Sequence, residues 1–485
     1  MRNLLQFLLL FACLLFAGST LADWHIGFSW HDQQRLYQLI LLCVAAGLTY
    51  FLPAANLPRY AFILLLTLLG FGLLSSCFAS FPAWALKEWA RYAGLLILAL
   101  IIADSARKPW FFKAILYLLA GAALLKAFQA LIYYLLALAL DHALMFNTAL
   151  MFYGFSNPRF LNQFQMLCMP ILAYLTILHW QAKHRYSKLL SGLFFITLLL
   201  QWCIAFSLGG RGLWLGLAAS HIALIVFFPR FWRLLRVQTA GGLLGFILFY
   251  LMFTMIPEWL GKTPVVIDNL RFGLSNREVI WQIAWDKFLA HPWLGIGPMH
   301  FSAEVNPVAA HPHQVILQWL AEWGIFATLV AIFIAVWGML HGLRYVHSEA
   351  GEQVDAALWM SILGALALAQ VDGVFVMPYT ETWLAILIGL AIARWSHTQA
   401  AHKTQENRWQ TYSLRLLAVP VILVVGNVLI NEVPTLAQDN QVRTEKHRVR
   451  YAPRFWIQGW ISMDGKPLPH APSSRFQQQS PRSLP

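Results

Sequence analysis

One stretch of this chain combines titratable imidazoles with polar side chains at helical spacing. His311, Pro312 and His313 are followed by Gln314 and, deeper in an apolar run, by Glu322. Histidine can accept a proton near neutral pH, so His313 is the candidate general base. A neutral histidine satisfied at a helix start is the alternative interpretation. We expect His313 to stand at the start of that helix, with Gln314 and Glu322 supporting it, because a carboxylate in an apolar helix needs a partner.

Three arginines occupy positions from which they could bind an anion. Arg211 is flanked by glycines in a short loop, Arg159 opens an apolar run, and Arg277 opens a polar helix. A guanidinium group can hold phosphate oxygens through two parallel hydrogen bonds. Asp372 follows an apolar run and is a further candidate for the same cavity. For each arginine, an interfacial anchor or a loop charge in water is the competing interpretation.

The histidines at 300, 311 and 313 raise the question of a zinc site. No cysteine or acidic residue completes a recognisable zinc pattern with them. No acidic pair of the DxD kind occurs in the loops on the same side of the membrane. We therefore expect neither a metal nor another cofactor.

The composition places these residues in a membrane protein. Of 485 residues, 59% are hydrophobic and only 11% are charged, whereas soluble proteins carry about a quarter charged residues. The net charge of +13 would suit a nucleic-acid partner. However, the lysines and arginines lie in short clusters between apolar runs, as topology signals do. We therefore expect an all-α polytopic membrane protein with no nucleic-acid partner.

About thirteen apolar runs are long enough to be membrane spans. The first, 1–22, is either an uncleaved helix, which we favour, or a signal peptide. The others lie near 36–52, 60–78, 91–104, 114–139, 161–180, 188–207, 212–229, 241–256, 314–340, 355–371, 381–395 and 414–430. Basic clusters recur at every second loop between these runs, which by the positive-inside rule predicts 12–13 transmembrane helices.

The same alternation predicts how the chain is divided. Residues 1–255 form N-terminal helices, 256–313 a large external loop, 314–432 C-terminal helices, and 433–485 an external tail with a disordered end. Within the loop, Ser275–Glu278 has the spacing of a capping box, which predicts a helix. Its Trp281, Trp285 and Phe288 share one face, so we expect this helix to rest on the membrane interface.

Four segments together resemble motifs of the O-antigen ligase superfamily, which includes O-antigen polymerases and bacterial protein O-oligosaccharyltransferases. They are His313–Gly324, Gly210–Gly216, Asn157–Arg159 and Pro292–Gly297. Gln314 stands where the family commonly has asparagine, which is a mild departure. The resemblance covers about residues 150–330, and the first 150 residues match only in hydropathy.

The resemblance implies a GT-C-like glycosyltransferase of the bacterial inner membrane, embedded in lipid, with its active site on the periplasmic face. Such enzymes move a glycan from undecaprenyl diphosphate to an acceptor hydroxyl. In this chain, His313 would be the catalytic base, and Arg159, Arg211 and Arg277 would bind the donor diphosphate without a metal.

The acceptor is left open by motifs that the superfamily shares. Lipid A–core sugar, another repeat unit and a protein serine or threonine are the alternatives. An odd number of spans places the tail outside, where 451–460 forms an aromatic patch. This is most like the short pilin O-oligosaccharyltransferases and favours a protein acceptor. A transporter of the same lipid-linked glycan is the alternative of another class, but it should carry charges near mid-bilayer and repeated broken helices.

Overall fold

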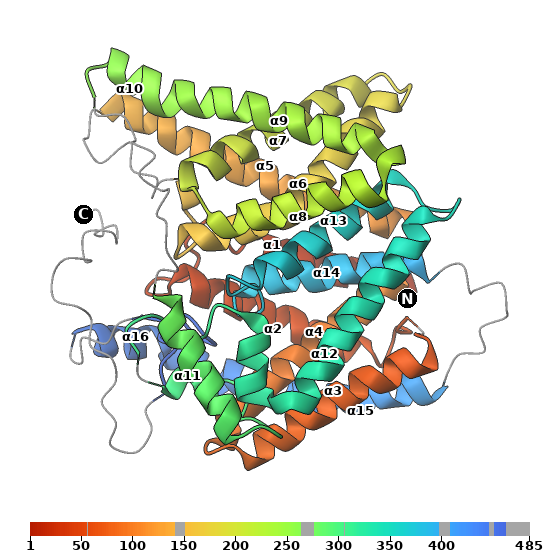
Figure 1. Cartoon of the computed structure of the whole chain (residues 1–485). Coiled ribbons are helices and arrows are strands. Elements are labelled where there is room, and N and C mark those ends of the chain that lie inside the picture. The colour runs from red at the N-terminus through yellow and green to blue at the C-terminus, as the bar shows by residue number, and fades with distance from the viewer. Residues whose placement is uncertain are drawn as a thin grey trace.

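The long helices lie side by side across the view in Figure 1, a computed structural model of the chain. The structure describes residues 1–55, 57–140, 151–262, 276–304, 306–396, 408–445 and 451–461. Within these ranges the regular secondary structure is helical, and no strand is formed. The predicted all-α class is confirmed. The capping residue Ser275 and the tail end at 465–485 lie outside the described residues.

Each predicted apolar run falls in a helix. These helices are α1 (Arg2–Gly18), α2 (Trp30–Leu48), α3 (Arg59–Phe78), α4 (Pro82–Ser105), α5 (Pro109–Leu140), α6 (Pro158–Gln181), α7 (Ser187–Leu208), α8 (Arg211–Phe227), α9 (Trp232–Tyr250), α12 (Val315–His347), α13 (Gln353–Leu368), α14 (Pro378–Trp395) and α15 (Arg408–Asn431). Three shorter helices complete the set: α10 (Ile256–Trp259), α11 (Arg277–Ala290) and α16 (Leu436–Glu445).

Seven helical segments of the described chain are long and apolar enough to cross a membrane by length and composition. They are α3, α5, α6, α7, the segment 229–259 with α9 and α10, α12, and the segment 408–443 with α15 and α16. Helices α1, α8 and α13 are apolar but shorter. The protein is therefore a multi-pass membrane protein, and the total of 12–13 spans stays a prediction.

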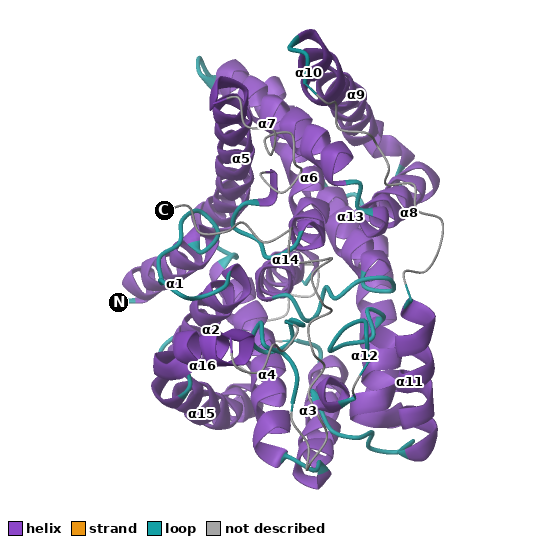
Figure 2. Ribbon diagram, turned by 90° about the vertical axis from the view of Figure 1, so that its left-hand side faces the viewer, coloured by secondary structure: helices purple, strands orange, loops and turns teal. Residues whose placement is uncertain are grey.

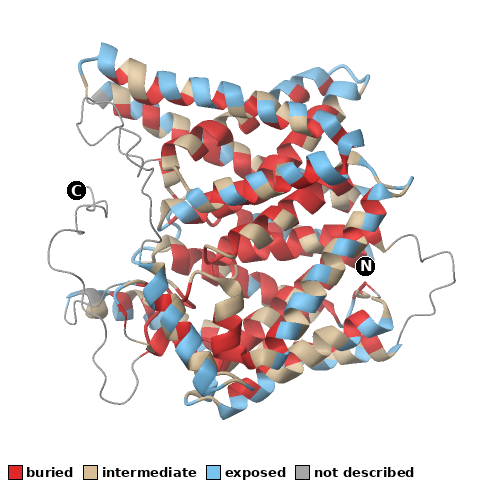
Figure 3. Cartoon of the chain, viewed as in Figure 1, coloured by how far each residue is buried: buried red, intermediate tan, exposed pale blue. Residues whose placement is uncertain are grey.

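Burial separates central from peripheral helices. In its most apolar 18-residue window, α6 is 89% buried, whereas α12 is 22% buried and the segment containing α9 is 28% buried. The outward faces of α9, α12 and α15 are exposed in Figure 3, while the inner helices are mostly buried. Exposed apolar side chains on the outer helices are what contact with lipid requires.

Two helices begin earlier than hydropathy predicted. Helix α2 starts at Trp30 rather than near 36, and α4 starts at Pro82 rather than near 91. The early turns contain Arg35, Glu88 and other polar residues, which lower the local hydropathy although they are fully buried. The hydropathy pattern therefore placed the polar first turns of these two helices in loops, although they are part of the helical core.

The N-terminal segment packs into the bundle. Tyr379 donates a hydrogen bond to the carbonyl of Ala17 at 3.0 Å, and Gln33 donates to the carbonyl of Ser19 at 2.6 Å. Whether residues 1–22 are a retained helix or a signal peptide stays a prediction.

Loops gather at one end of the bundle, onto which Figure 2 looks. Helices α2, α4, α6, α8, α12 and α14 begin at this end, as the contacts described below establish. A helix N-terminus carries a partial positive charge and unpaired N–H groups. Convergence of six such ends makes this face favourable for a bound anion.

Candidate functional site

His313 lies in a strained turn just outside α12. The N-cap of α12 is Gln314, whose side chain accepts a hydrogen bond from the backbone N–H of Leu317. His313 therefore precedes the cap, and the expectation that it begins the helix is wrong. Its φ of 54° is left-handed, which costs a residue with a β-carbon about 1 kcal/mol. Strain of this kind is held by surrounding contacts and occurs often at functional sites.

Two neighbours hold the His313 ring. Its Nδ1 lies 3.4 Å from Oδ1 of Asp372, in the loop between α13 and α14. The backbone N–H of His313 donates to Nδ1 of His311 at 3.3 Å, and the two ring centroids are 4.0 Å apart. Gln314 also donates to Gln370 at 3.1 Å, which joins the start of α12 to the same loop. The predicted His313, Gln314 and Asp372 therefore lie together.

The surroundings of His313 favour its neutral form. Burial lowers the pKa of His313 from its ordinary value. Asp372 opposes this and raises the pKa, whereas the positive charges of Arg277 and Arg159 lower it further; the net direction is down. At neutral pH the imidazole is therefore ready to accept a proton.

The aspartate beside it stays ionised. Burial acts to raise the pKa of Asp372, but His313, Arg159 and the N–H of Gly373 favour the carboxylate, and the net pKa is lowered. An ionised carboxylate next to a histidine orients the ring and stabilises the imidazolium that forms when a proton arrives.

The three predicted arginines converge on this pair. Burial lowers the pKa of Arg277, and the nearby charges of Arg159 and Arg211 lower it further while Asp372 raises it. Like charges interact in this way only over short distances, so the three cations share one electrostatic environment. Arg159 and Arg211 are exposed and Arg277 is half-buried. The site thus has excess positive charge beside one carboxylate.

Small residues permit this convergence. Gly212, in the first turn of α8, lies against Leu368 at the end of α13: a β-carbon there would come within 2.5 Å of a Leu368 methyl and 3.9 Å of Oδ2 of Asp372. Gly210 lies against Asn162 in the first turns of α6. The glycines around Arg211 therefore allow the start of α8 to approach both α6 and the loop that holds Asp372.

Two buried amides lie near the start of α6. Asn162 and Gln163 are 2% and 0% exposed. The Oδ1 atom of Asn162 and both polar atoms of Gln163 form no hydrogen bond with any described residue. Buried polar atoms are normally satisfied, so this helix end offers hydrogen-bonding groups for a polar ligand.

Helix α12 is interrupted where a second motif meets it. Gly324 has a φ of 76°, and a β-carbon on it would come within 2.2 Å of the carbonyl oxygen of Trp293. Backbone groups released by the break pair with the turn 292–297: Ile296 N–H donates to Ala321 at 2.8 Å, and Ile325 N–H donates to the carbonyl of Pro292 at 2.9 Å. The two motifs at 292–297 and 313–324 are therefore halves of one structural unit.

Glu322 has the partner that its burial requires. Its Oε2 lies 2.6 Å from Nη2 of Arg454, and its Oε1 accepts from the backbone N–H of Phe301 at 3.1 Å. The amide of Gln318, one turn earlier, also faces the Arg454 guanidinium. Glu322 thus joins α12 both to the loop before it and to the distant C-terminal tail.

Arg454 extends this pair into a buried ion network. The network alternates three arginines with three glutamates: Glu322, Arg454, Glu88, Arg91, Glu381 and Arg35. Its side chains come from α2, α4, α12, α14 and the tail, and each is at most 1% exposed. The formal charges cancel, as burial demands. Sequence reasoning identified only Glu322, although charges in or beside apolar helices were the available signal.

The tail segment 451–461 is embedded in the protein. Phe455, Trp456 and Trp460 are 1%, 2% and 2% exposed. The carbonyl of Phe455 accepts from Nε of Arg35 at 2.9 Å, and the N–H of Ile461 donates to Ser302 at 3.1 Å. The tail therefore lies at the His313 end of the bundle, but its aromatic residues are core. The expectation of an aromatic patch that binds a partner or lipid is wrong.

Helix α11 packs over the site loop. Ile280 and Ala284 are buried against Phe301 and Ala321, and Nε1 of Trp281 donates to the carbonyl of Pro312 at 3.0 Å. The predicted interfacial face is therefore divided, because Trp281 contacts the protein while Trp285 is 42% exposed. The helix begins after Asn276, whose side chain makes no capping hydrogen bond.

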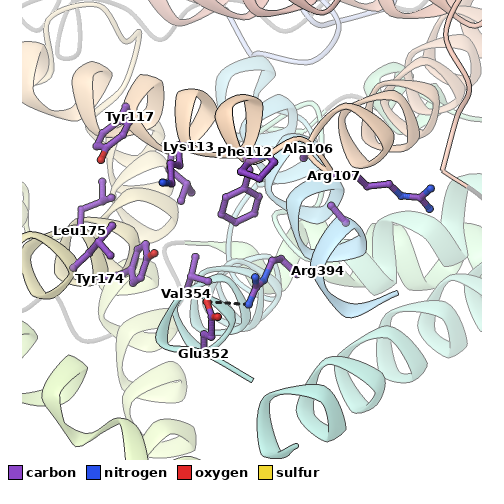
Figure 4. A pocket seen from close by; sticks show the side chains of 14 residues that line it. Ala106, Arg107, Phe112, Lys113, Tyr117, Tyr174, Leu175, Glu352, Val354 and Arg394 are labelled. Carbon is purple, nitrogen blue, oxygen red and sulfur yellow. Dashed lines mark ion pairs between the residues drawn. The ribbon is translucent and has the colours of Figure 1, made fainter. Parts of the chain in front are cut away.

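The described residues contain no group of three or more histidine, cysteine, aspartate or glutamate side chains that could hold a metal ion. A pocket of about 290 Å³ lies at the other end of the bundle, among α5, α6, α13 and α14. Figure 4 shows its Arg394 paired with Glu352, 3.2 Å away. Arg394 also pairs with Asp355 at 2.7 Å. The charge of Arg394 is thus neutralised. The residues that line this pocket include no histidine that could act as a base, as His313 could beside Asp372.

One comparison with known proteins found a match that overlaps part of the site. No curated protein matches the chain. Residues 196–332 match the family described as O-antigen ligase. The matched segment includes Arg211, Arg277, His313 and the 292–297 turn, and it ends before Asp372 and Arg454. Within this multi-pass, all-helical membrane protein, the segment 196–332 is therefore similar to the O-antigen ligase family.

Proposed function

We propose that the protein transfers an oligosaccharide from a polyprenyl diphosphate, of the undecaprenyl type, to an acceptor hydroxyl. The observation that carries the proposal is the His313–Asp372 pair, beside which Arg277 lies within electrostatic range of Arg159 and Arg211. The imidazole suits removal of a hydroxyl proton, and the arginines suit binding of a diphosphate. The donor is the substrate, and membrane lipid surrounds the site.

In the proposed step, the acceptor hydroxyl gives its proton to His313 as its oxygen attacks the anomeric carbon of the glycan. The bond between that carbon and the diphosphate oxygen breaks, and its electron pair stays on the diphosphate. Arg159, Arg211 and Arg277 would stabilise the charge that develops there. Asp372 would stabilise the imidazolium until the proton is lost to water.

The placement of the buried charges favours an enzyme over a transporter of the same glycan. Charged side chains do occur inside helices in this structure. However, Arg35, Glu322 and Glu381 lie within seven residues of their helix starts, which is about 10 Å of helix. They are also paired and belong to the His313 end, rather than forming a site near mid-bilayer.

For the acceptor, we propose a protein serine or threonine, as in pilin glycosylation, with the active site on the periplasmic face of the inner membrane. The aromatic residues of the tail are buried, so they do not support a protein acceptor. The location of the tail at the His313 end of the bundle is the support that remains. Transfer to lipid A–core sugar or polymerisation of O-antigen repeats is the second candidate, favoured by the description of the matching family. Deleting the gene distinguishes them: either pilin or lipopolysaccharide should lose its glycan.

The base is tested by His313→Asn. Asparagine is similar in size and tolerates the left-handed backbone at this position, so the turn should persist. We expect transfer to fall by about 10²–10⁴-fold, the contribution typical of a general base, while donor binding is retained. Glycosylated acceptor and bound lipid-linked donor should be measured at matched expression, with His311→Ala as the comparison. Near-normal turnover in His313→Asn would overturn the assignment.

A further inference from the structure

The end of the bundle opposite His313 carries a cavity that the proposed reaction does not use. It has a volume of about 820 Å³ and lies among the last turns of α6 and the first turns of α7 and α9. Arg159 begins α6, and Trp180 lies 21 residues later (180 − 159), which is about 30 Å along the helix. That length is close to the thickness of the hydrocarbon core. The cavity therefore lies at the other membrane boundary.

Three cations line this cavity: Lys188 on α7 and Arg233 and Arg236 on α9. All three are exposed, and no carboxylate of the described chain forms an ion pair with any of them. This contrasts with Arg394 in the smaller pocket, which two carboxylates neutralise. The cavity consequently concentrates uncompensated positive charge between helices, which attracts an anion.

Two of the three cations, Lys188 and Arg236, each contact a tryptophan ring. Nζ of Lys188 lies 4.2 Å from the ring centroid of Trp180 and donates to its carbonyl, and Cζ of Arg236 lies 3.2 Å from the ring centroid of Trp232. Trp180 and Trp232 are 65% and 40% exposed. Exposed tryptophans of this kind occupy the headgroup level of a bilayer, and cation–π contacts limit the loss of side-chain entropy on binding.

The remaining wall contains both polar and apolar side chains. Ser191 and Thr176 are bonded to each other, with Oγ of Ser191 donating to the Thr176 carbonyl at 2.8 Å. Ile177, Phe195 and Val237 supply apolar lining beside them. A molecule that fits has a compact anionic group at the boundary and an apolar part beside α7 and α9.

We infer that this cavity binds the phosphate headgroup of an anionic phospholipid, with the acyl chains along the exposed faces of α7 and α9. Basic pockets between membrane helices recognise such headgroups. The inference is independent of the transfer reaction, because the cavity lies at the end of α6 opposite Arg159 and none of its lining residues belongs to the His313 site.

The test counts the phospholipids that stay bound to the purified protein, by native mass spectrometry after addition of phosphatidylglycerol or phosphatidylcholine. The pocket variant is Lys188→Gln/Arg233→Gln/Arg236→Gln. The control is Lys108→Gln/Lys183→Gln/Arg185→Gln, which removes the same charge from loops at the same end without touching the cavity.

We expect the wild type and the control to retain phosphatidylglycerol in preference to phosphatidylcholine. Each removed cation should weaken phosphatidylglycerol binding about fivefold, or on the order of a hundredfold for the pocket variant. Arg233→Lys/Arg236→Lys keeps the charge and should bind nearly as the wild type does, which separates lost charge from lost fold.

Three results would overturn the inference. If the pocket and control variants lost phosphatidylglycerol binding equally, the binding would depend on the total charge of this face and not on the cavity. Equal retention of phosphatidylcholine would remove the anionic requirement. Displacement of phosphatidylglycerol by millimolar inorganic phosphate would assign the cavity to a free anion.

Discussion

Arg454→Met should destabilise the protein strongly, because Arg454 joins two buried glutamates. Its Nη2 lies 2.6 Å from Glu322 and 3.0 Å from Glu88, and all three side chains are at most 1% exposed. Removing one partner of a buried ion pair costs about 3–5 kcal/mol, since the other charge stays desolvated. Glu88 keeps Arg91 at 2.7 Å, whereas Glu322 keeps only a backbone N–H among the contacts described for it. We therefore expect a loss within this range, about 3–5 kcal/mol, which comes mainly from Glu322.

The measurement is the free energy of unfolding of the purified protein, from denaturant titration in mixed micelles, with transfer activity of the same preparations. Arg443→Met is the control: this arginine precedes the embedded tail segment and donates to the Trp460 carbonyl at 3.3 Å. Its replacement should cost about 1 kcal/mol or less. Arg454→Met/Glu322→Gln removes the uncompensated charge and should recover about 1 kcal/mol or more relative to Arg454→Met. Equal costs for Arg454→Met and Arg443→Met would refute the reasoning.

Three further predictions concern the reaction. His313 must be neutral to accept a proton, so transfer should fall as the pH drops through its pKa; Asp372 raises that pKa and Arg277 lowers it. Asp372→Asn should therefore move the acid limb of the pH–rate profile to lower pH, and Arg277→Gln should move it to higher pH. A shift in the same direction for both variants would contradict this reasoning. Arg211→Lys should impair transfer nearly as much as Arg211→Ala, because a point charge does not replace a two-pronged donor, and full activity in Arg211→Ala would reassign the residue to lipid anchoring. Activity should survive excess chelator, and loss restored by magnesium would show a required metal.

The helices were predictable because lipid imposes long apolar segments, and each predicted run lies in a helix. The starts of α2 and α4 were not, because hydropathy treats Arg35 and Glu88 as solvent-seeking. In the structure these charges are paired and buried. A pair spaced at i and i+3, such as Glu88 and Arg91, was the signal that a helix already contained them.

The site residues were predictable from residue type and position, since the glycines around Arg211 and the 292–297 turn constrain where the backbone can approach closely. The left-handed turn at His313 was not, because histidine has only a small local preference for that conformation. Contacts with His311, which is close in the chain, and with Asp372, which is distant, hold His313 in this turn. Arg454 was missed because 132 residues separate it from Glu322, and local pattern carries no information about such a pairing.

The position of Arg454 in the chain also determines when the buried ion network can be completed. Glu88 and Glu322 enter the bundle with α4 and α12, but the arginine that joins them follows α15, the last long helix. During synthesis these carboxylates therefore remain without their shared cation until the tail has reached the same side of the membrane. A chain that stops before residue 451 lacks Arg454, so Glu88 and Glu322 never gain their shared cation. The buried ion network can therefore close only after the last long helix and the tail segment have been made.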